Sequence, residues 1–238
     1  LAVGVDVSTM LGIVTDAPIR FFRPAAAGGF GALAAIANLG GFDVDTTLNA
    51  LGIQYGQTSG TLQPHVEGVP LLGLQVGFNA RAAIVSADLA QAGFVGPRDF
   101  FTGKYGYLEL FEMGQCDLDS FLPTLGRTWQ IEAMAHKPFA SGRLTHGGVD
   151  ALCQLRAAHG FGAGDVAAVR CEVPPVLFNL VGRPDLDRPE PNYAKLCMKY
   201  VLGALMVRGS VDVAEFRGDA LTDPAIHDFA AKVEVVLN

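Results

Sequence analysis

Residues 169–175 read Val-Arg-Cys-Glu-Val-Pro-Pro, and this stretch decides that the fold is not purely helical. Val169, Cys171 and Val173 alternate with two charged residues, which is the period-two pattern of a half-buried strand. The two prolines are expected to end this strand, because proline cannot donate to a strand ladder. A second alternating stretch, beginning at Val233, predicts another strand.

Amphipathic helices are expected between these two strands. Asn192 can cap one of them, and Asp223-Pro224 opens another. The first would carry Leu196, Tyr200 and Gly203 on one face, and the second Ile226, Phe229 and Val233. Residues 182–191, which contain three prolines and several charges, are predicted to form an exposed loop.

The part of the chain before residue 128 has only helical signals, and glycine repeatedly marks the helix ends. Phe30 to Leu39 has apolar residues at helical spacing and stops at Gly40-Gly41, a pattern typical of a left-handed helix end. Its small residues would let neighbouring helices approach closely.

Two further helices are expected in this part of the chain. Asp43 or Asp45 can accept hydrogen bonds from the free amides of the helix that follows them. Ala80 to Ala92 predicts a helix that stops at Gly93, with Ile84, Val85 and Leu89 on one side. We therefore expect a two-domain α and α+β fold, with an all-helical domain over residues 1–128 and an α+β domain over residues 129–238.

Composition excludes several classes of function. The 238 residues include 17 Lys and Arg against 24 Asp and Glu, a formal charge of −7, which disfavours nucleic acid and anionic membranes as partners. The mean hydropathy of +0.32 raises the question of a membrane span, but the uncharged stretch Pro24–Phe42 is mostly Ala and Gly and is predicted to be a packed core helix. No export signal opens the chain, and its first residue, Leu1, suggests that the natural N-terminus lies upstream.

The four cysteines lack C-x-x-C spacing, and no histidines stand at metal-binding spacing. We therefore expect free thiols in a reducing cytoplasm and no metal.

Three segments resemble the MmgE/PrpD family, which includes 2-methylcitrate dehydratases, cis-aconitate decarboxylases and iminodisuccinate epimerases. They are Ala50-Leu51-Gly52-Ile53 with Gln57-Thr58-Ser59-Gly60, then Gly93-Phe94-Val95-Gly96-Pro97 with Gly103-x-x-Gly106, and Lys137-Pro138-Phe139 with Arg143-x-Thr145-His146. Their order and spacing are similar to those of the family through almost the whole chain.

The resemblance implies a helical domain plus an α+β lid, an active site between the two, a homodimer and no cofactor. Family members are longer at both ends, so this chain would hold the later part of the helical domain and much of the lid. An Asp- and His-containing loop from their N-terminal part has no counterpart here.

The resemblance also implies the candidate catalytic residues. Lys137 matches the family's active-site lysine, whose ammonium would bind a carboxylate or donate a proton. Without the resemblance, a surface lysine before a turn is the favoured interpretation. His146 stands where a helix with Val149, Leu152 and Leu155 should begin. There the helix dipole favours the neutral imidazole, which suits a base or an orienting group, although a histidine at a helix start can also simply bond the backbone.

Candidate substrate-binding residues are Arg143, Ser59 and Gln75. Arg143 could clamp a carboxylate bidentately or pair with an acid on the surface. Ser59 could contact substrate or be an ordinary small residue between packed helices.

Three departures from the family pattern bear on the substrate. Arg20 to Pro24 lacks the histidine that many relatives place before the proline, Leu71 to Gly77 lacks a lysine and a histidine of the decarboxylase-like members, and Phe178 stands in place of a tyrosine. These changes disfavour decarboxylation of cis-aconitate.

We therefore expect a cofactor-independent lyase, in particular a hydro-lyase, or an isomerase that moves a proton next to a carboxylate of a small carboxylic acid. The alternative is a catalytically incomplete homologue that serves as a binding or oligomerisation module.

Overall fold

A computed structural model describes residues 1–238, and these fall into two compact units, each with its own hydrophobic core. The first unit comprises Leu1–Leu62 and Leu71–Ala135, and the second comprises Gln63–Pro70 and His136–Asn238. Both strands lie in the second unit, so the predicted α and α+β fold class is confirmed. The sequence placed a single boundary after residue 128, whereas the chain enters the second unit for Gln63–Pro70 and again at His136. No helix combines the length and apolar character that crossing a membrane requires.

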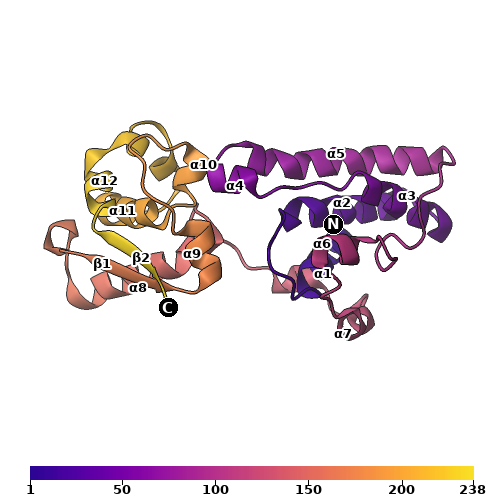
Figure 1. Ribbon diagram of the computed structural model, residues 1–238, viewed down its shortest axis with the longest axis horizontal. Coiled ribbons are helices and arrows are strands. Elements are labelled where there is room, and N and C mark those ends of the chain that lie inside the picture. Colours follow the sequence, from indigo (N-terminus) through magenta and orange to yellow (C-terminus); the bar gives the residue numbers. More distant parts are fainter. The chain divides into compact units, whose positions relative to one another are not determined.

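The first unit contains helices and short 3-10 turns, together with one isolated β-bridge between Thr15 and Cys116 (Figure 1). Its helix α2 contacts α1, α3 and α5. The elements are α1 (Ala2–Ile13), α2 (Arg23–Leu39), α3 (Val44–Gly56), α5 (Leu71–Gln91), α6 (Tyr107–Glu112), α7 (Leu118–Phe121), η1 (Leu122–Thr124) and η2 (Gln130–Ala133).

Helix α2 packs closely because its contact positions are small. A methyl group added at Gly31 would lie 1.8 Å from Ser8 Oγ and 2.4 Å from the carbonyl oxygen of Gly4, both on α1. A methyl group at Gly29 would lie 2.5 Å from Gln54 Nε2 on α3. The prediction that small residues let helices approach closely is therefore confirmed.

The helix ends in this region follow the sequence signals. Helix α2 ends before Gly40, and Gly41 has φ +62°, so the left-handed stop is confirmed. Asp43 is the residue that caps α3, since its carboxylate accepts a hydrogen bond of 2.7 Å from the Thr46 N–H.

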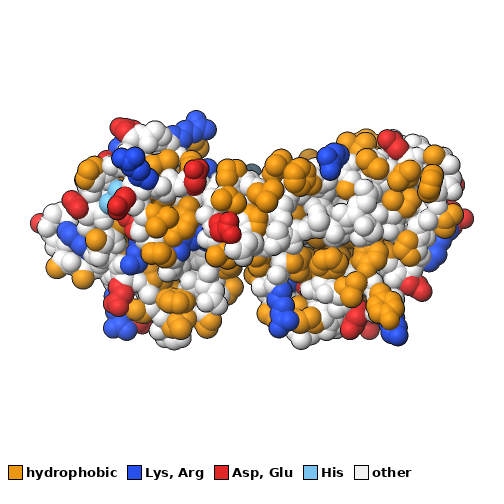
Figure 2. Space-filling model, turned by 45° about the horizontal axis from the view of Figure 1, so that its top comes forward, with side chains coloured by type: hydrophobic (Ala, Val, Ile, Leu, Met, Phe, Trp, Pro, Cys, Tyr) orange, Lys and Arg blue, Asp and Glu red, His pale blue; other side chains and the backbone are white.

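Helix α5 differs from its prediction in length and orientation. It begins at Leu71 rather than near Ala80, and its buried face consists of alanines and small polar residues. Ile84 and Val85, which the sequence placed on one apolar side of the helix, are 56% and 41% exposed. The reason is that α5 lies against α2 and α3, where close approach favours small side chains. In Figure 2, hydrophobic side chains are correspondingly frequent on the visible face of the first unit, which lies on the right.

The second unit packs helices against a parallel two-stranded sheet (Figure 1). Both predicted strands are confirmed, with Val169 paired to Val233 and Val173 paired to Leu237. The elements are α4 (Gln63–Glu67), η3 (Arg143–Thr145), α8 (His146–His159), η4 (Ala163–Asp165), β1 (Val169–Val173), α9 (Pro175–Val181), α10 (Pro191–Ala194), α11 (Met198–Arg208), η5 (Val213–Phe216), η6 (Gly218–Thr222), α12 (Pro224–Ala230) and β2 (Val233–Leu237).

The helix predicted after Asn192 is wrong in its extent. Asn192 lies inside the short α10, which begins at Pro191, and the chain turns before α11 begins at Met198. Cys197 has an extended backbone that separates the two helices.

Helix α12 begins as predicted, because Asp223 caps it by accepting from the Ala225 N–H at 3.0 Å, and it buries Ile226 and Phe229. It ends at Ala230, however, so Val233 lies in β2 and not on this helix.

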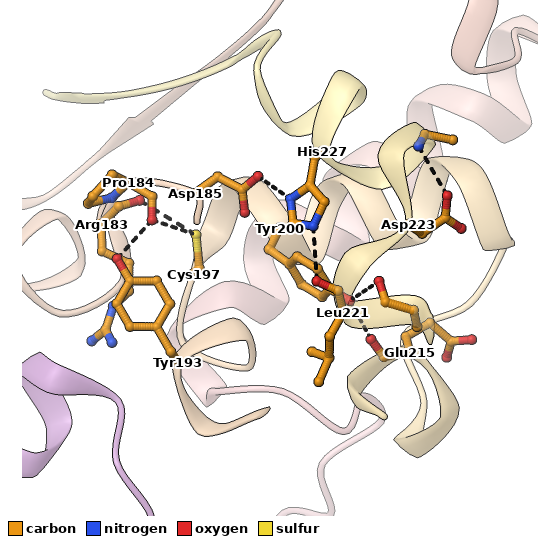
Figure 3. A network of polar contacts seen from close by, with 12 residues as sticks. Arg183, Pro184, Asp185, Tyr193, Cys197, Tyr200, Glu215, Leu221, Asp223 and His227 are labelled. Atoms are coloured by element: carbon orange, nitrogen blue, oxygen red, sulfur yellow. Dashed lines mark hydrogen bonds and ion pairs between the residues drawn. The ribbon is translucent and has the colours of Figure 1, made fainter. Parts of the chain in front are cut away.

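Loop 182–190 is irregular, as predicted, but several of its groups make specific contacts (Figure 3). Asp185 Oδ2 lies 2.6 Å from His227 Nδ1, and His227 Nε2 lies 3.0 Å from the carbonyl oxygen of Leu221. Burial lowers the pKa of His227, but the bonds to Asp185 and Leu221 outweigh it, so the pKa is raised. The imidazole therefore ties this loop to α12 and the turn before it.

Arg183 ties a distant segment to the same loop. Its Nη2 lies 2.9 Å from the carbonyl oxygen of His65 and 3.1 Å from His65 Nδ1, and its guanidinium stacks over the Tyr193 ring at 4.8 Å. Gly68 lies against the same tyrosine, with φ +74°. These contacts hold Gln63–Pro70 in the second unit.

We predict that Gly68→Ala destabilises the second unit by at least about 2 kcal/mol. The left-handed backbone alone costs a non-glycine residue about 1–2 kcal/mol, and the new methyl group would lie 2.4 Å from Tyr193 Cβ. Urea unfolding followed by circular dichroism measures the effect. Gly73→Ala is the matched control, because a methyl group there meets nothing and improves helix propensity by up to about 1 kcal/mol. Equal unfolding midpoints for the two variants would contradict the assigned contact.

We also predict that His227→Gln costs about 1.5–3 kcal/mol at pH 5.5, the usual worth of a hydrogen bond to a charged group, and less at pH 8.5. The folded pKa is raised above the ordinary value, so the stabilisation is complete below about pH 6.5 and disappears as pH rises through the folded pKa. Unfolding free energies at both pH values measure this, with exposed His136→Gln as control. A pH-independent difference between wild type and His227→Gln would rule out the charged pair.

Candidate functional site

The segment from Phe139 to His146 is fixed by backbone hydrogen bonds to the rest of the second unit. The Ala140 N–H donates to the carbonyl oxygen of Val211 at 3.1 Å, and the Gly142 N–H donates to that of Lys195 at 2.8 Å. Within the segment, the hydroxyls of Ser141 and Thr145 are 2.8 Å apart and both residues are buried. These bonds hold the turn that precedes α8 against the rest of the second unit.

His146 begins α8, as predicted, and is 2% exposed. Its Nε2 lies 3.4 Å from the carbonyl oxygen of Ser141, and the Phe139 ring meets the imidazole edge-on at 5.3 Å. Its Nδ1 is buried and has no hydrogen-bond partner. If Nε2 carries the proton, Nδ1 is left as an unpaired basic nitrogen.

The pKa of His146 is lowered from its ordinary value, mainly because the imidazole is buried. The positive charges of Arg143 and Lys137 lower it further, while the bond to Ser141 opposes the change. The expected neutral imidazole is therefore found, but burial is its main cause rather than the helix end.

Lys137 and Arg143 both lie close enough to His146 to affect its charge. Each side chain is exposed on this unit and makes no hydrogen bond or ion pair within the chain. The structure thus brings together three of the five predicted site residues: two unpaired cations and a buried neutral imidazole.

The other two predicted residues, Ser59 and Gln75, lie in the first unit. Ser59 is exposed, and its backbone is held by Asn79, whose amide donates to the Ser59 carbonyl oxygen at 3.0 Å. Gln75 is buried and brackets Thr61, accepting from its N–H at 2.6 Å and donating to its carbonyl oxygen at 3.0 Å. Both amide atoms of Gln75 are thus engaged with the backbone of one loop.

Sequence reasoning missed Asn79, which is fully buried and links Ser59 to α5. One signal was present, because Gln75, Asn79 and Ser86 share the alanine-rich face of α5. A polar residue on a small-residue face must find partners there when that face is buried.

The structure also shows what occupies two of the positions that depart from the family pattern. Arg23 forms a two-point contact with the buried Glu112, at 2.9 and 2.8 Å. Its guanidinium is thereby committed to a structural ion pair. Phe178 packs against the hydrophobic core of the second unit. No cluster of three or more His, Cys, Asp or Glu residues is present that could hold a metal ion.

Comparisons with known proteins agree with the two-part organisation. Residues 1–117 match the MmgE/PrpD N-terminal domain and residues 139–238 match the MmgE/PrpD C-terminal domain. The cis-aconitate decarboxylase-like protein of Aspergillus oryzae is 28% identical over 228 residues, which are 91% of this chain and 46% of that protein. The chain therefore spans about half the length of this relative.

The first match includes Ser59 and Gln75, and the second includes Arg143 and His146 and begins two residues after Lys137. The chain belongs to the MmgE/PrpD family.

Proposed function

We propose that this chain provides part of a lyase or isomerase site that moves a proton at the carbon next to a carboxylate of a small carboxylic acid. The observation that carries the proposal is the buried, unpaired Nδ1 of His146 beside the unpaired cations Lys137 and Arg143. Membership of the MmgE/PrpD family supports lyase-type chemistry in general and does not specify the substrate.

The two cations suit the anionic part of such a substrate. The guanidinium of Arg143 can bind a carboxylate through two parallel hydrogen bonds, whereas the ammonium of Lys137 acts as a point charge. Removal of a proton next to a carboxylate places negative charge on its oxygens, and a cation already positioned there lowers the barrier. In this proposal, Lys137 stabilises the enediolate and Arg143 holds the substrate.

His146 suits proton transfer because its pKa is lowered and its imidazole is neutral at pH 7. A neutral imidazole accepts a proton without first having to lose one. Since Nδ1 is buried, His146 acts either directly, after a small movement of the turn, or by orienting the group that takes the proton.

The relative's name points to decarboxylation of cis-aconitate, but Phe178 and the Arg23–Glu112 pair favour a different substrate. Phe178 has no hydroxyl to donate, and Arg23 is neutralised by its partner. We therefore propose dehydration or epimerisation, as in the 2-methylcitrate dehydratase-like members, ahead of decarboxylation.

Proton exchange in heavy water tests this proposal directly. The chain is incubated with 2-methylcitrate, cis-aconitate and related small acids, and deuterium at the carbon next to each carboxylate is followed by NMR. We predict that Lys137→Ala and His146→Gln each reduce exchange by about 10²–10⁴-fold, the usual contribution of one acid–base group. Exposed Lys104→Ala and His159→Gln are the matched controls and should exchange at the wild-type rate.

Absence of exchange with every acid would contradict the proposed enzyme and favour the alternative, a catalytically incomplete module that binds or oligomerises. Binding of the same acids is then measured by calorimetry with wild type and Arg143→Ala. Binding that Arg143→Ala weakens indicates a binding module, whereas binding that it leaves unchanged indicates a chain that does not use this site. Exchange that survives both substitutions would remove the assigned roles.

A further inference from the structure

The first unit contains a pocket that none of the predicted site residues line. Its volume is about 440 Å³, which lies inside the range of about 300–1,000 Å³ that is typical of small-molecule sites. Twelve of its fourteen lining residues are hydrophobic, and the other two are Arg98 and Thr102. The pocket is therefore apolar, and its polar side chains come from a single loop.

The walls of the pocket are buried side chains from several elements. Leu11 of α1, Phe100 of the loop before α6 and Leu108 of α6 all line it and are at most 5% exposed. The loop is fixed to α6, because the Tyr107 N–H donates to the carbonyl oxygen of Phe100 at 2.8 Å. These contacts form the pocket before any ligand binds.

Exposed apolar side chains also line the pocket. Leu122 and Leu125, which follow α7, are 49% and 39% exposed. Protein interiors leave few voids larger than a water molecule, and exposed apolar surface beside a concave site is typical of a binding surface. The pocket therefore indicates a ligand with an apolar body.

The two polar residues indicate the charge of such a ligand. Arg98 Nη2 lies 3.1 Å from Asp45 Oδ1, and the side chains of the pair are 46% and 83% exposed. An exposed pair of this kind contributes little, and a guanidinium has further N–H donors to offer. The Thr102 hydroxyl has no hydrogen-bond partner in the chain. Both groups are thus available to an anion.

We propose that this pocket binds the hydrocarbon chain of a medium-chain monocarboxylic acid, with the carboxylate on Arg98 and Thr102. A guanidinium binds a carboxylate through two parallel hydrogen bonds, and the threonine hydroxyl can donate another. The remaining lining offers no side-chain polar group, so a second carboxylate inside the pocket would be buried without a partner. The pocket therefore discriminates against dicarboxylic acids of the same length.

Calorimetry with a series of acids tests the apolar part of the proposal. Butanoate, hexanoate and octanoate are titrated into the chain below the concentrations at which they form micelles. We expect the affinity to rise about fourfold with each CH₂ group that becomes buried. Octanedioate should bind at least about tenfold more weakly than octanoate, because its second carboxylate loses its hydration. Equal affinities for butanoate and octanoate, or for octanoate and octanedioate, would overturn the proposal.

Charge variants test the position of the carboxylate. Arg98→Gln should weaken octanoate binding about tenfold, as expected for the loss of a charged hydrogen bond, and leave the affinity for 1-octanol unchanged. Asp45→Asn should strengthen octanoate binding about twofold to fivefold, because the competing ion pair is removed. Arg81→Gln is the matched control, since Arg81 is an exposed arginine of α5 that does not line the pocket. Octanoate binding that Arg98→Gln leaves unchanged would contradict the assigned carboxylate position.

Filling the pocket tests where the hydrocarbon chain lies. Leu118→Trp adds bulk to a half-buried lining residue of α7 and should weaken binding of both octanoate and 1-octanol at least about tenfold. Leu39→Trp is the matched control, because Leu39 is 84% exposed and lies outside the pocket. Circular dichroism shows whether each variant is folded. A folded Leu118→Trp variant that binds octanoate like the wild type would overturn the assigned pocket, and Arg98→Gln decides the case if Leu118→Trp does not fold.

Failure of both octanoate and 1-octanol to bind the wild type would also overturn the proposal and favour an apolar protein segment as the occupant. These results are independent of the deuterium-exchange test, because all the lining residues belong to the first unit and none is a proposed site residue. Arg143→Ala should accordingly bind octanoate like the wild type.

Discussion

The close approach of α2 to its neighbours is the constraint on which the first unit depends. Gly31 permits contact with α1, and Gly29 permits contact with α3 and α5, where Gln54 and Asn79 fill the space beside it. Small side chains bury little apolar surface each, so the polar groups buried with them must be fully paired. This is why Asn79 and Gln75 bond to the 59–61 backbone, and why the larger apolar side chains of α5 lie outside.

In the second unit, backbone hydrogen bonds place the turn that carries the candidate site residues, so the side chains of Lys137 and Arg143 are not needed to hold it. Ala140 and Gly142 donate to carbonyl oxygens that follow α11 and α10, respectively. Ser141 and Thr145 use their hydroxyls within the turn. Lys137 and Arg143 are consequently left without partners, and His146 is buried without its Nδ1 being satisfied. An unsatisfied buried nitrogen is costly, which is typical of positions retained for chemistry.

Local signals made much of the fold predictable. Alternation in 169–173, the cap at Asp43 and the stop at Gly41 depend on neighbouring residues only, and the structure follows them. The face of α5 was not predictable, since burying alanines in preference to Ile84 depends on how closely other helices approach. For the candidate site, motif resemblance singled out Lys137, Arg143 and His146, which stay predictions as site residues. The pairing of Arg23 with Glu112 could not be predicted, because it joins residues far apart in the sequence.

The charges of the proposed site explain how binding and basicity would be coupled. With a net charge of −7, the whole chain does not attract an anionic acid, but exposed charges are screened beyond about 8 Å, so nearby cations decide binding. Arg143 and Lys137 also help to keep His146 neutral while no anion is present. A bound carboxylate offsets their charge, which raises the affinity of the imidazole for a proton. In the proposed function, His146 would thus be unprotonated before a carboxylate binds and would become more basic once it is bound.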